Sequence, residues 1–98
     1  MPAVTRTGDA TTTGHGCDTT TTVIGPSTDV FCNSKGVERK TDPTVSHDIT
    51  AGLGCVAHTS SISAGSSTVF VNSKAIARIG DSCDSGAITG GSTNVFAG

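Results

Sequence analysis

A thirteen-residue segment occurs twice in the chain, and this repeat constrains the fold more than any other feature of the sequence. Residues 30–42 read VFCNSKGVERKTD and residues 69–81 read VFVNSKAIARIGD, so seven of the thirteen positions are identical without a gap. Both copies end in an Arg-x-x-Asp unit. Two full copies of one unit indicate a fold built by repetition of a single structural element.

A third copy is divided between the two ends of the chain. Its second half, VTRTGD, occupies residues 4–9, and its first half, VFAG, occupies residues 95–98. This unit can be completed only if the two ends meet in space, whereas an open solenoid would end in atypical capping repeats. The sequence therefore predicts one closed all-β domain over residues 1–98, with three hairpin repeats about a pseudo-threefold axis. We expect residues 93–97 to pair with residues 2–6.

Local preferences favour strands throughout the chain. Thr, Ser, Gly and Val dominate, and no window places apolar residues at the helical spacing i, i+3, i+4, i+7. Strands are predicted at 19–24, 28–32, 37–40, 67–71, 75–79, 87–89 and 92–96. Residues 41–58 contain the breakers Asp42-Pro43 and Gly52-Leu53-Gly54, and we expect an inserted loop there.

The composition predicts a thin core. The chain has no Trp, no Tyr and three Phe, and each Phe follows a Val in the repeat. A core of these three Phe with Val, Ile, Leu and Ala leaves a domain of this size close to zero net stability. A metal ion, a partner surface or cross-links should therefore contribute.

Charge and hydropathy exclude several classes of protein. The net charge is −2 and the 6 Lys and Arg are spread along the chain, so a nucleic-acid-binding role is not expected. No stretch approaches the ~20 apolar residues of a membrane helix. The first residues lack the apolar run of a signal peptide. We expect synthesis in the cytoplasm and export, if any, by a route that needs no signal peptide.

The chain has four cysteines, and none of them forms a Cys-x-x-Cys motif. In a cytosolic product they are expected to be metal ligands or buried thiols, with disulfides as the lesser alternative. Cys17 lies two residues after His15 and would point to the opposite side of an extended chain. Cys17 and Cys32 are interpreted as small buried hydrophobic residues.

The lead-in to the Arg-x-x-Asp units resembles the Pro-Ala-Ala-Arg motif of the PAAR-repeat family. It reads Pro-Ala-Val-Thr-Arg over residues 2–6 and Ala-Ile-Ala-Arg over residues 75–78, and residues 65–72 (GSSTVFVN) resemble a second signature of that family. The resemblance implies a small conical β-domain that caps the trimeric β-helical spike of type VI secretion systems and contractile phage tails. It also implies a zinc ion at the apex, held by three His and one Cys.

Four side chains are candidates for that zinc site. His15, His47 and His58 lie in polar connections between an Arg-x-x-Asp and the next Val-Phe, and Cys83 lies in the third such connection. The resemblance implies that these four hold one structural zinc ion, because three imidazoles and a thiolate make a closed tetrahedral set. From the residues alone two alternatives stay open. The histidines are ordinary solvated loop residues, or Cys55 replaces His47 as a ligand.

The repeated Arg and Asp residues are interpreted as structural ion pairs that tie a strand end to a turn or to a neighbouring repeat. Three copies of a catalytic pair would be unusual. There is also no Gly-x-Ser-x-Gly motif. A closed four-donor zinc site leaves no open position for a reacting water. We therefore expect a protein that is not an enzyme.

With the resemblance, the sequence predicts a structural tip that caps and sharpens a trimeric β-helical spike and helps to pierce a target envelope. One tip would sit on each trimer, be monomeric on its own and contact the target cell envelope transiently. It would lie at the tail tip of a virion or be secreted through a type VI apparatus, and the sequence does not separate these cases. The alternative is a free-standing small zinc-stabilised binding module without a spike partner.

Overall fold

The structure is a computed structural model that describes residues 1–98, and it contains strands, turns and bridges but no helix. No helix therefore has the length and apolar character needed to cross a membrane. The strands form five two-stranded antiparallel sheets, β1–β2, β3–β4, β5–β6, β7–β8 and β9–β10. Their bounds are β1 Ala10–Thr12, β2 Thr20–Thr22, β3 Phe31–Cys32, β4 Lys35–Gly36, β5 His47–Ala51, β6 Gly54–His58, β7 Phe70–Val71, β8 Lys74–Ala75, β9 Ser82–Cys83 and β10 Gly86–Ala87. The predicted all-β class is confirmed.

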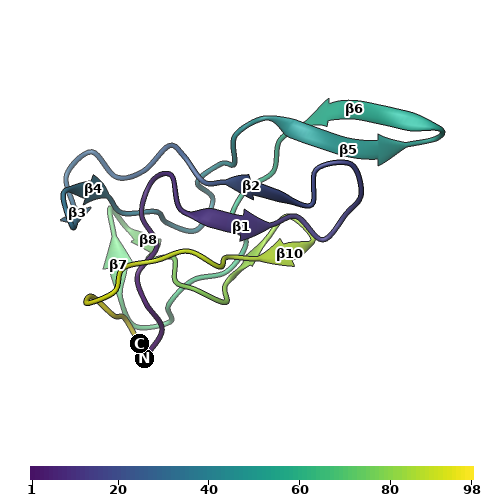
Figure 1. Cartoon of the computed structure of the whole chain (residues 1–98). Coiled ribbons are helices and arrows are strands. Elements are labelled where there is room, and N and C mark those ends of the chain that lie inside the picture. Colours follow the sequence, from purple (N-terminus) through teal and green to yellow (C-terminus); the bar gives the residue numbers. More distant parts are fainter.

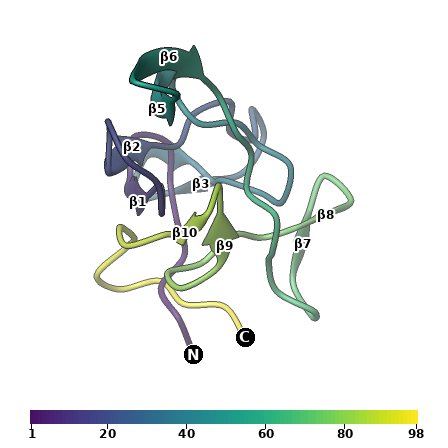
Figure 2. The same ribbon diagram turned by 90° about the vertical axis from the view of Figure 1, so that its right-hand side faces the viewer.

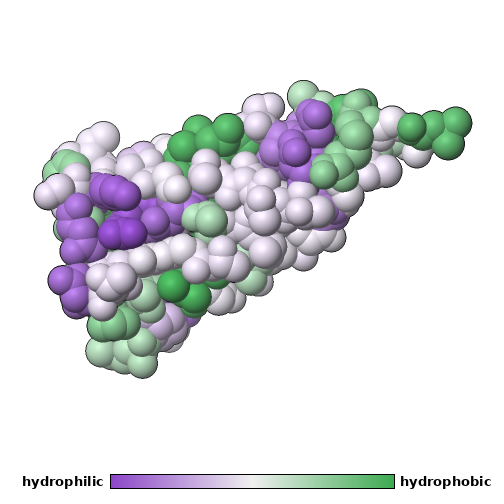
Figure 3. Space-filling model, viewed as in Figure 1, coloured by the Kyte–Doolittle hydropathy of each residue, from purple (hydrophilic) through white to green (hydrophobic).

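The molecule tapers from a broad base to a narrow apex (Figure 1 and Figure 3). Its principal extents are 42 × 24 × 22 Å. The base holds both termini together with hairpins β3–β4 and β7–β8, and the apex is hairpin β5–β6, which projects beyond the other strands (Figure 1). The taper agrees with the cone implied by the family resemblance.

The two ends of the chain complete the third repeat, as the divided copy predicted. Ala3 forms an antiparallel bridge with Phe96. The Val4 N–H donates to the Val95 carbonyl at 3.0 Å, and the Ala97 N–H donates to the Pro2 carbonyl at 3.0 Å. The N- and C-termini accordingly lie side by side in both ribbon views (Figure 1 and Figure 2). Pairing of the ends thus takes the place of a covalent turn.

Three equivalent bridges join the repeats into a closed ring. They connect Val4 to Arg78, Arg6 to Val37, and Arg39 to Ile76. In each bridge an Arg of one repeat faces the Val or Ile that lies two residues before the Arg of the next repeat. This cyclic order gives the domain its pseudo-threefold axis.

The two full repeats each form a tight hairpin where one was predicted, with shorter strands. The turns are Asn33-Ser34 and Asn72-Ser73, and all four residues have positive φ, between 53° and 66°. Two central residues with positive φ characterise the type I′ turn, which matches the twist of the flanking strands. The predicted strands ran further because β propensity continues past the paired residues.

Two apolar clusters fill the interior. The base cluster consists of Val4, Cys32, Val37, Val71, Ile76 and Ala97. The inner cluster consists of Val23, Ile62, Ala77, Cys83 and Ile88. Each of the three repeats contributes two residues to the base cluster. One is the residue after the repeat Phe, and the other is the Val or Ile two residues before the repeat Arg.

The phenylalanines lie outside this core, so the expectation that they would form it is wrong. Phe31, Phe70 and Phe96 are 61%, 60% and 49% exposed. Side chains alternate between the two faces of a strand. Because the residue that follows each Phe points into the base cluster, the Phe itself points to solvent.

The Arg-x-x-Asp units form the predicted ion pairs. The Arg–Asp distances are 2.9 Å for Arg6–Asp9, 2.8 Å for Arg39–Asp42 and 3.0 Å for Arg78–Asp81. Arg6 and Arg39 also reach a neighbouring repeat, where their Nη1 atoms donate to Asn33 Oδ1 and Asn72 Oδ1 at 3.0 Å. Each pair therefore fixes a turn, and two of the three also link adjacent repeats.

Residues 41–58 are not an irregular inserted loop, which corrects the sequence-based expectation. They contain hairpin β5–β6, which pairs five residues on each side and is the longest sheet of the molecule. Gly52 and Leu53 are the two turn residues, and Gly52 has φ +59°. A Gly with positive φ at the first central position is typical of a two-residue hairpin turn. Of the glycines that suggested a break, Gly52 begins the turn of this hairpin and Gly54 is the first residue of β6.

Candidate metal centre

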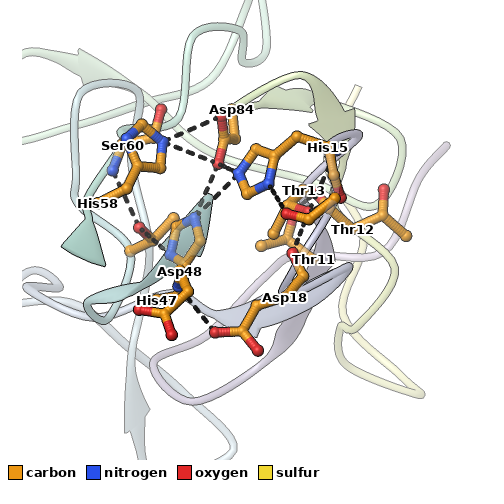
Figure 4. A network of polar contacts seen from close by, with 12 residues as sticks. Thr11, Thr12, Thr13, His15, Asp18, His47, Asp48, His58, Ser60 and Asp84 are labelled. Atoms are coloured by element: carbon orange, nitrogen blue, oxygen red, sulfur yellow. Dashed lines mark hydrogen bonds and ion pairs between the residues drawn. The ribbon is translucent and has the colours of Figure 1, made fainter. Parts of the chain in front are cut away.

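Three histidines and one aspartate converge at the inner end of hairpin β5–β6 (Figure 4). His47 and His58 face each other as the first cross-strand pair of β5–β6. His15 comes from the connection between β1 and β2, and Asp84 from the turn between β9 and β10. Their candidate ligand atoms all lie within 4.8 Å of one another. The threefold fold thus brings three separate connections to one point.

The donor atoms are spaced closely enough to close on a single ion. Asp84 Oδ2 lies 2.8 Å from His15 Nε2, 2.9 Å from His47 Nε2 and 3.3 Å from His58 Nε2. The Nε2 atoms of His15 and His47 are 3.3 Å apart. A tetrahedral zinc site with bonds of 2.0–2.1 Å separates its donors by about 3.3 Å. The cluster needs only small adjustments to reach that geometry.

Backbone carbonyls fix the orientation of two of the imidazoles. His15 Nδ1 donates to the Gly16 carbonyl at 3.0 Å, and His47 Nδ1 donates to the Val45 carbonyl at 2.9 Å. In the neutral rings this leaves the Nε2 lone pairs directed at Asp84. Such a hydrogen bond from the other ring nitrogen is the usual support of a metal-bound histidine. Lone pairs that face a carboxylate repel it unless a cation or protons lie between them.

The pKa shifts in the cluster also indicate that positive charge stabilises it. Burial alone would raise the pKa of Asp84, but the hydrogen bonds that His47, His15 and His58 donate when their rings are protonated hold that pKa below its usual value. The pKa of His15 is raised, first by the hydrogen bond to the Gly16 carbonyl and then by Asp84. The Asp84 side chain is 7% exposed and the His47 side chain 3%. A largely buried carboxylate among three imidazoles suits a divalent cation.

Cys83, the fourth ligand implied by the family resemblance, is not one of the four residues that converge here. Its thiol is fully buried in the inner cluster, and burial raises its pKa, which opposes the thiolate that binds metal. Cys83 lies two residues after its repeat Asp, where the other repeats have Thr11 and Thr44, and these are buried as well. All three form bridges to members of the inner cluster. Comparison of the three repeats thus assigns position 83 to the interior, and the next residue, Asp84, is the one that joins the histidines.

A family model described as PAAR motif matches residues 7–90 of the chain. The chain belongs to the PAAR motif family. No curated protein matches it in sequence. The match spans all three of the histidines and Asp84, so the cluster lies within the family-defining part of this PAAR domain.

A disulfide joins Cys17 to Cys55 in this PAAR domain, with 6.2 Å between the Cα atoms. Cys17 is therefore not a buried hydrophobic residue, and Cys55 is not free to compete as a ligand. Cys17 bridges Ile49 of β5 and Cys55 lies on β6, so the backbone pairing brings the two thiols together. Cys32 is buried in the base cluster, as expected. The disulfide ties the connection that carries His15 to the hairpin that carries the other two histidines.

Gly14 allows the connection that carries His15 to approach the one that carries Asp84. It has φ +72°, and a Cβ at this position would collide with the Ser85 carbonyl. Gly14→Ala should therefore displace His15 and weaken metal binding by about tenfold or more, the effect of about 1.4 kcal/mol. The measurement is a competition titration with a chromophoric chelator.

Gly8→Ala is the matched control for Gly14→Ala, because Gly8 has φ +86° but nothing within 4 Å of a new Cβ. Both substitutions carry the backbone strain of a positive φ, roughly 1 kcal/mol. The Gly8 variant should lose a little stability and keep its metal affinity. Equal affinities in the two variants would contradict the assigned role of Gly14.

Proposed function

We propose that this PAAR domain is the structural tip of the spike of a contractile injection machine, a type VI secretion system or a phage tail. The observation that carries the proposal is the polarity of the molecule. Three threefold-related exposed aromatic side chains mark the broad base, and a compact histidine and aspartate cluster lies at the narrow end. The proposed role is mechanical and not enzymatic.

The base suits a threefold β-structured partner. Phe31, Phe70 and Phe96 are each about half exposed or more, from 49% to 61%, and Val30 and Val95 beside them are each 39% exposed. In the hairpins there, Gly36 of β4 and Ala75 of β8 accept hydrogen bonds from neighbouring repeats, whereas β3 and β7 pair with no strand other than their hairpin partner. A trimeric β-helix could extend its sheets onto the edges of β3 and β7 and cover the apolar side chains. One tip per trimer follows from the pseudo-threefold axis.

The apex suits a structural metal ion, and we propose zinc held by His15, His47, His58 and Asp84. When bound, the ion would cross-link the connections that meet at the apex. It would take the place of an apolar core there, because the cross-section is too narrow to bury apolar side chains. Four protein donors complete a tetrahedral set and leave no open position, which is the mark of a structural site. The transient contact with a target envelope is assigned to this end, since the spike would cover the other.

The partner proposal is tested by mixing the purified tip with a trimeric β-helical spike and recording native mass spectra. The expected product is one tip on three spike chains, and electron microscopy of the complex should show hairpin β5–β6 at the distal end. Phe70→Asp should weaken the complex about 30-fold or more, the effect of losing an interfacial anchor worth ~2 kcal/mol.

Leu53→Asp is the control for the partner test, because Leu53 is fully exposed in the turn of β5–β6, and that hairpin lies at the end of the molecule opposite the base (Figure 1). This variant should bind the spike as the parent does. A Leu53 variant that loses the complex, with a Phe70 variant that keeps it, would reverse the proposed orientation. No complex with any trimeric β-helix would favour a free-standing metal-stabilised module.

A further inference from the structure

The three repeats meet at a closed ring of backbone hydrogen bonds, which we call the axial ring. It is made by the residues that precede each repeat Arg, namely Thr5, Glu38 and Ala77. The Thr5 N–H donates to the Ala77 carbonyl, the Glu38 N–H to the Thr5 carbonyl and the Ala77 N–H to the Glu38 carbonyl, each at 3.0 Å. All three residues are completely buried. The ring therefore lies on the pseudo-threefold axis, inside the molecule.

Glu38 breaks the chemical symmetry of this ring. The Thr5 hydroxyl donates to the Gly90 carbonyl at 3.1 Å, and Ala77 has no polar side-chain atom. Both carboxyl oxygens of Glu38, by contrast, are buried and have no hydrogen-bond partner. Ala77 belongs to the inner cluster, and Val37, the neighbour of Glu38 in sequence, belongs to the base cluster. The Glu38 carboxyl is thus buried without a polar partner, on a ring whose neighbouring residues belong to the two apolar clusters.

The charges near Glu38 do not compensate for the cost of burying an ionised carboxylate. The ionisable groups that act on it are Asp42, Arg39 and Asp9, and it acts in turn on the Cys83 thiol. Arg39 is engaged by Asp42 through Nε and Nη2 at 2.8 and 2.9 Å, so that pair is neutralised internally. A buried carboxylate without a cation or hydrogen bonds is strongly disfavoured and takes up a proton instead.

We propose that Glu38 is a proton-binding site on the axis, and that the folded domain holds one proton there whose loss loosens the axial ring. Burial first, and then the negative charge of Asp42, raise the pKa of Glu38 to about 8, against a lowering by Arg39. In the unfolded chain this carboxyl is ionised above its ordinary pKa of 4.5. Between these two values the folded state binds more protons than the unfolded state, so stability falls as pH rises.

The direct test uses the fact that Glu38 is the only glutamate of the chain, which also has no glutamine. Protein labelled with ¹³C at the glutamate carboxyl should give one resonance, and its titration can be followed while the protein stays folded. The expected midpoint lies more than two pH units above that of the same resonance in urea. A folded protein whose resonance is already that of a carboxylate at pH 6 would overturn the proposal.

The consequence for stability is tested with Glu38→Gln, which keeps the shape of the side chain and cannot ionise. For the wild type kept metal-free by a chelator at every pH, the unfolding equilibrium constant should rise by about tenfold per pH unit between pH 5 and pH 8. The Glu38→Gln variant, or Glu38→Met if the amide is not tolerated, should lose most of this slope. Asp29→Asn, which removes an exposed carboxylate, is the control and should keep it. An unchanged slope in the Glu38 variants would contradict the assignment.

Discussion

Asp84→Ala should abolish tight metal binding, whereas Cys83→Thr should keep one metal ion per chain. Asp84 supplies the oxygen on which the three histidines converge. Cys83→Thr installs the residue type that the other two repeats carry at the equivalent buried position. We expect the affinity of the Asp84 variant to fall 100-fold or more, which corresponds to about 2.8 kcal/mol.

The same metal should account for a large share of the stability. A ligand present at 1,000 times its dissociation constant stabilises the folded state by about 4 kcal/mol. Chelation should then lower the melting temperature by roughly 15 °C or more in a domain of this size. Acid should release the metal as well, because the imidazoles must be unprotonated to bind. If Cys83→Thr loses the metal and Asp84→Ala retains it, the thiolate inferred from the family resemblance is the fourth donor.

Reduction of the Cys17–Cys55 disulfide should be the second large effect. The bridge closes a loop with a sequence separation of 38. In the chain-entropy model, a cross-link over such a loop stabilises the folded state by up to about 4 kcal/mol. A reductant should therefore lower the melting temperature of the wild type, and it should leave the Cys17→Ser/Cys55→Ser double variant unaffected.

Thiol titration of the unfolded, unreduced chain provides an independent check on this bridge. It should find two free thiols, those of Cys32 and Cys83. Four free thiols, or a wild type whose melting temperature does not respond to the reductant, would contradict the cross-link. Because the bridge joins the two connections that carry the histidines, reduction should also weaken metal binding.

The repeat pattern was sufficient to predict the closed fold. The divided copy predicted the pairing of Ala3 with Phe96, and the spacing of Arg and Asp predicted the three ion pairs. These inferences succeed because each repeat forms the same bridges and the same Arg–Asp ion pair as the other two. The outward position of the phenylalanines was missed, although strand alternation from the small residues that follow them would have revealed it.

The apex was harder to predict, because it is the part that departs from the repeat. Hairpin β5–β6 occurs in one connection only, and its glycines suggested a break until the pairing of His47 with His58 showed a turn. Histidine content identified three members of the cluster. Asp84 was missed because its neighbour Cys83 has a thiol, which is a more characteristic zinc ligand than a carboxylate. Comparison with Thr11 and Thr44 at the same register would have placed Cys83 in the interior.

The most direct test of the account is elemental analysis with native mass spectrometry on protein purified without a histidine tag or added metal. The account predicts one zinc ion per chain, lost as the pH falls through the range in which histidine is protonated. A well-folded protein that binds no metal, and that takes up none from zinc at neutral pH, would contradict the metal-supported apex.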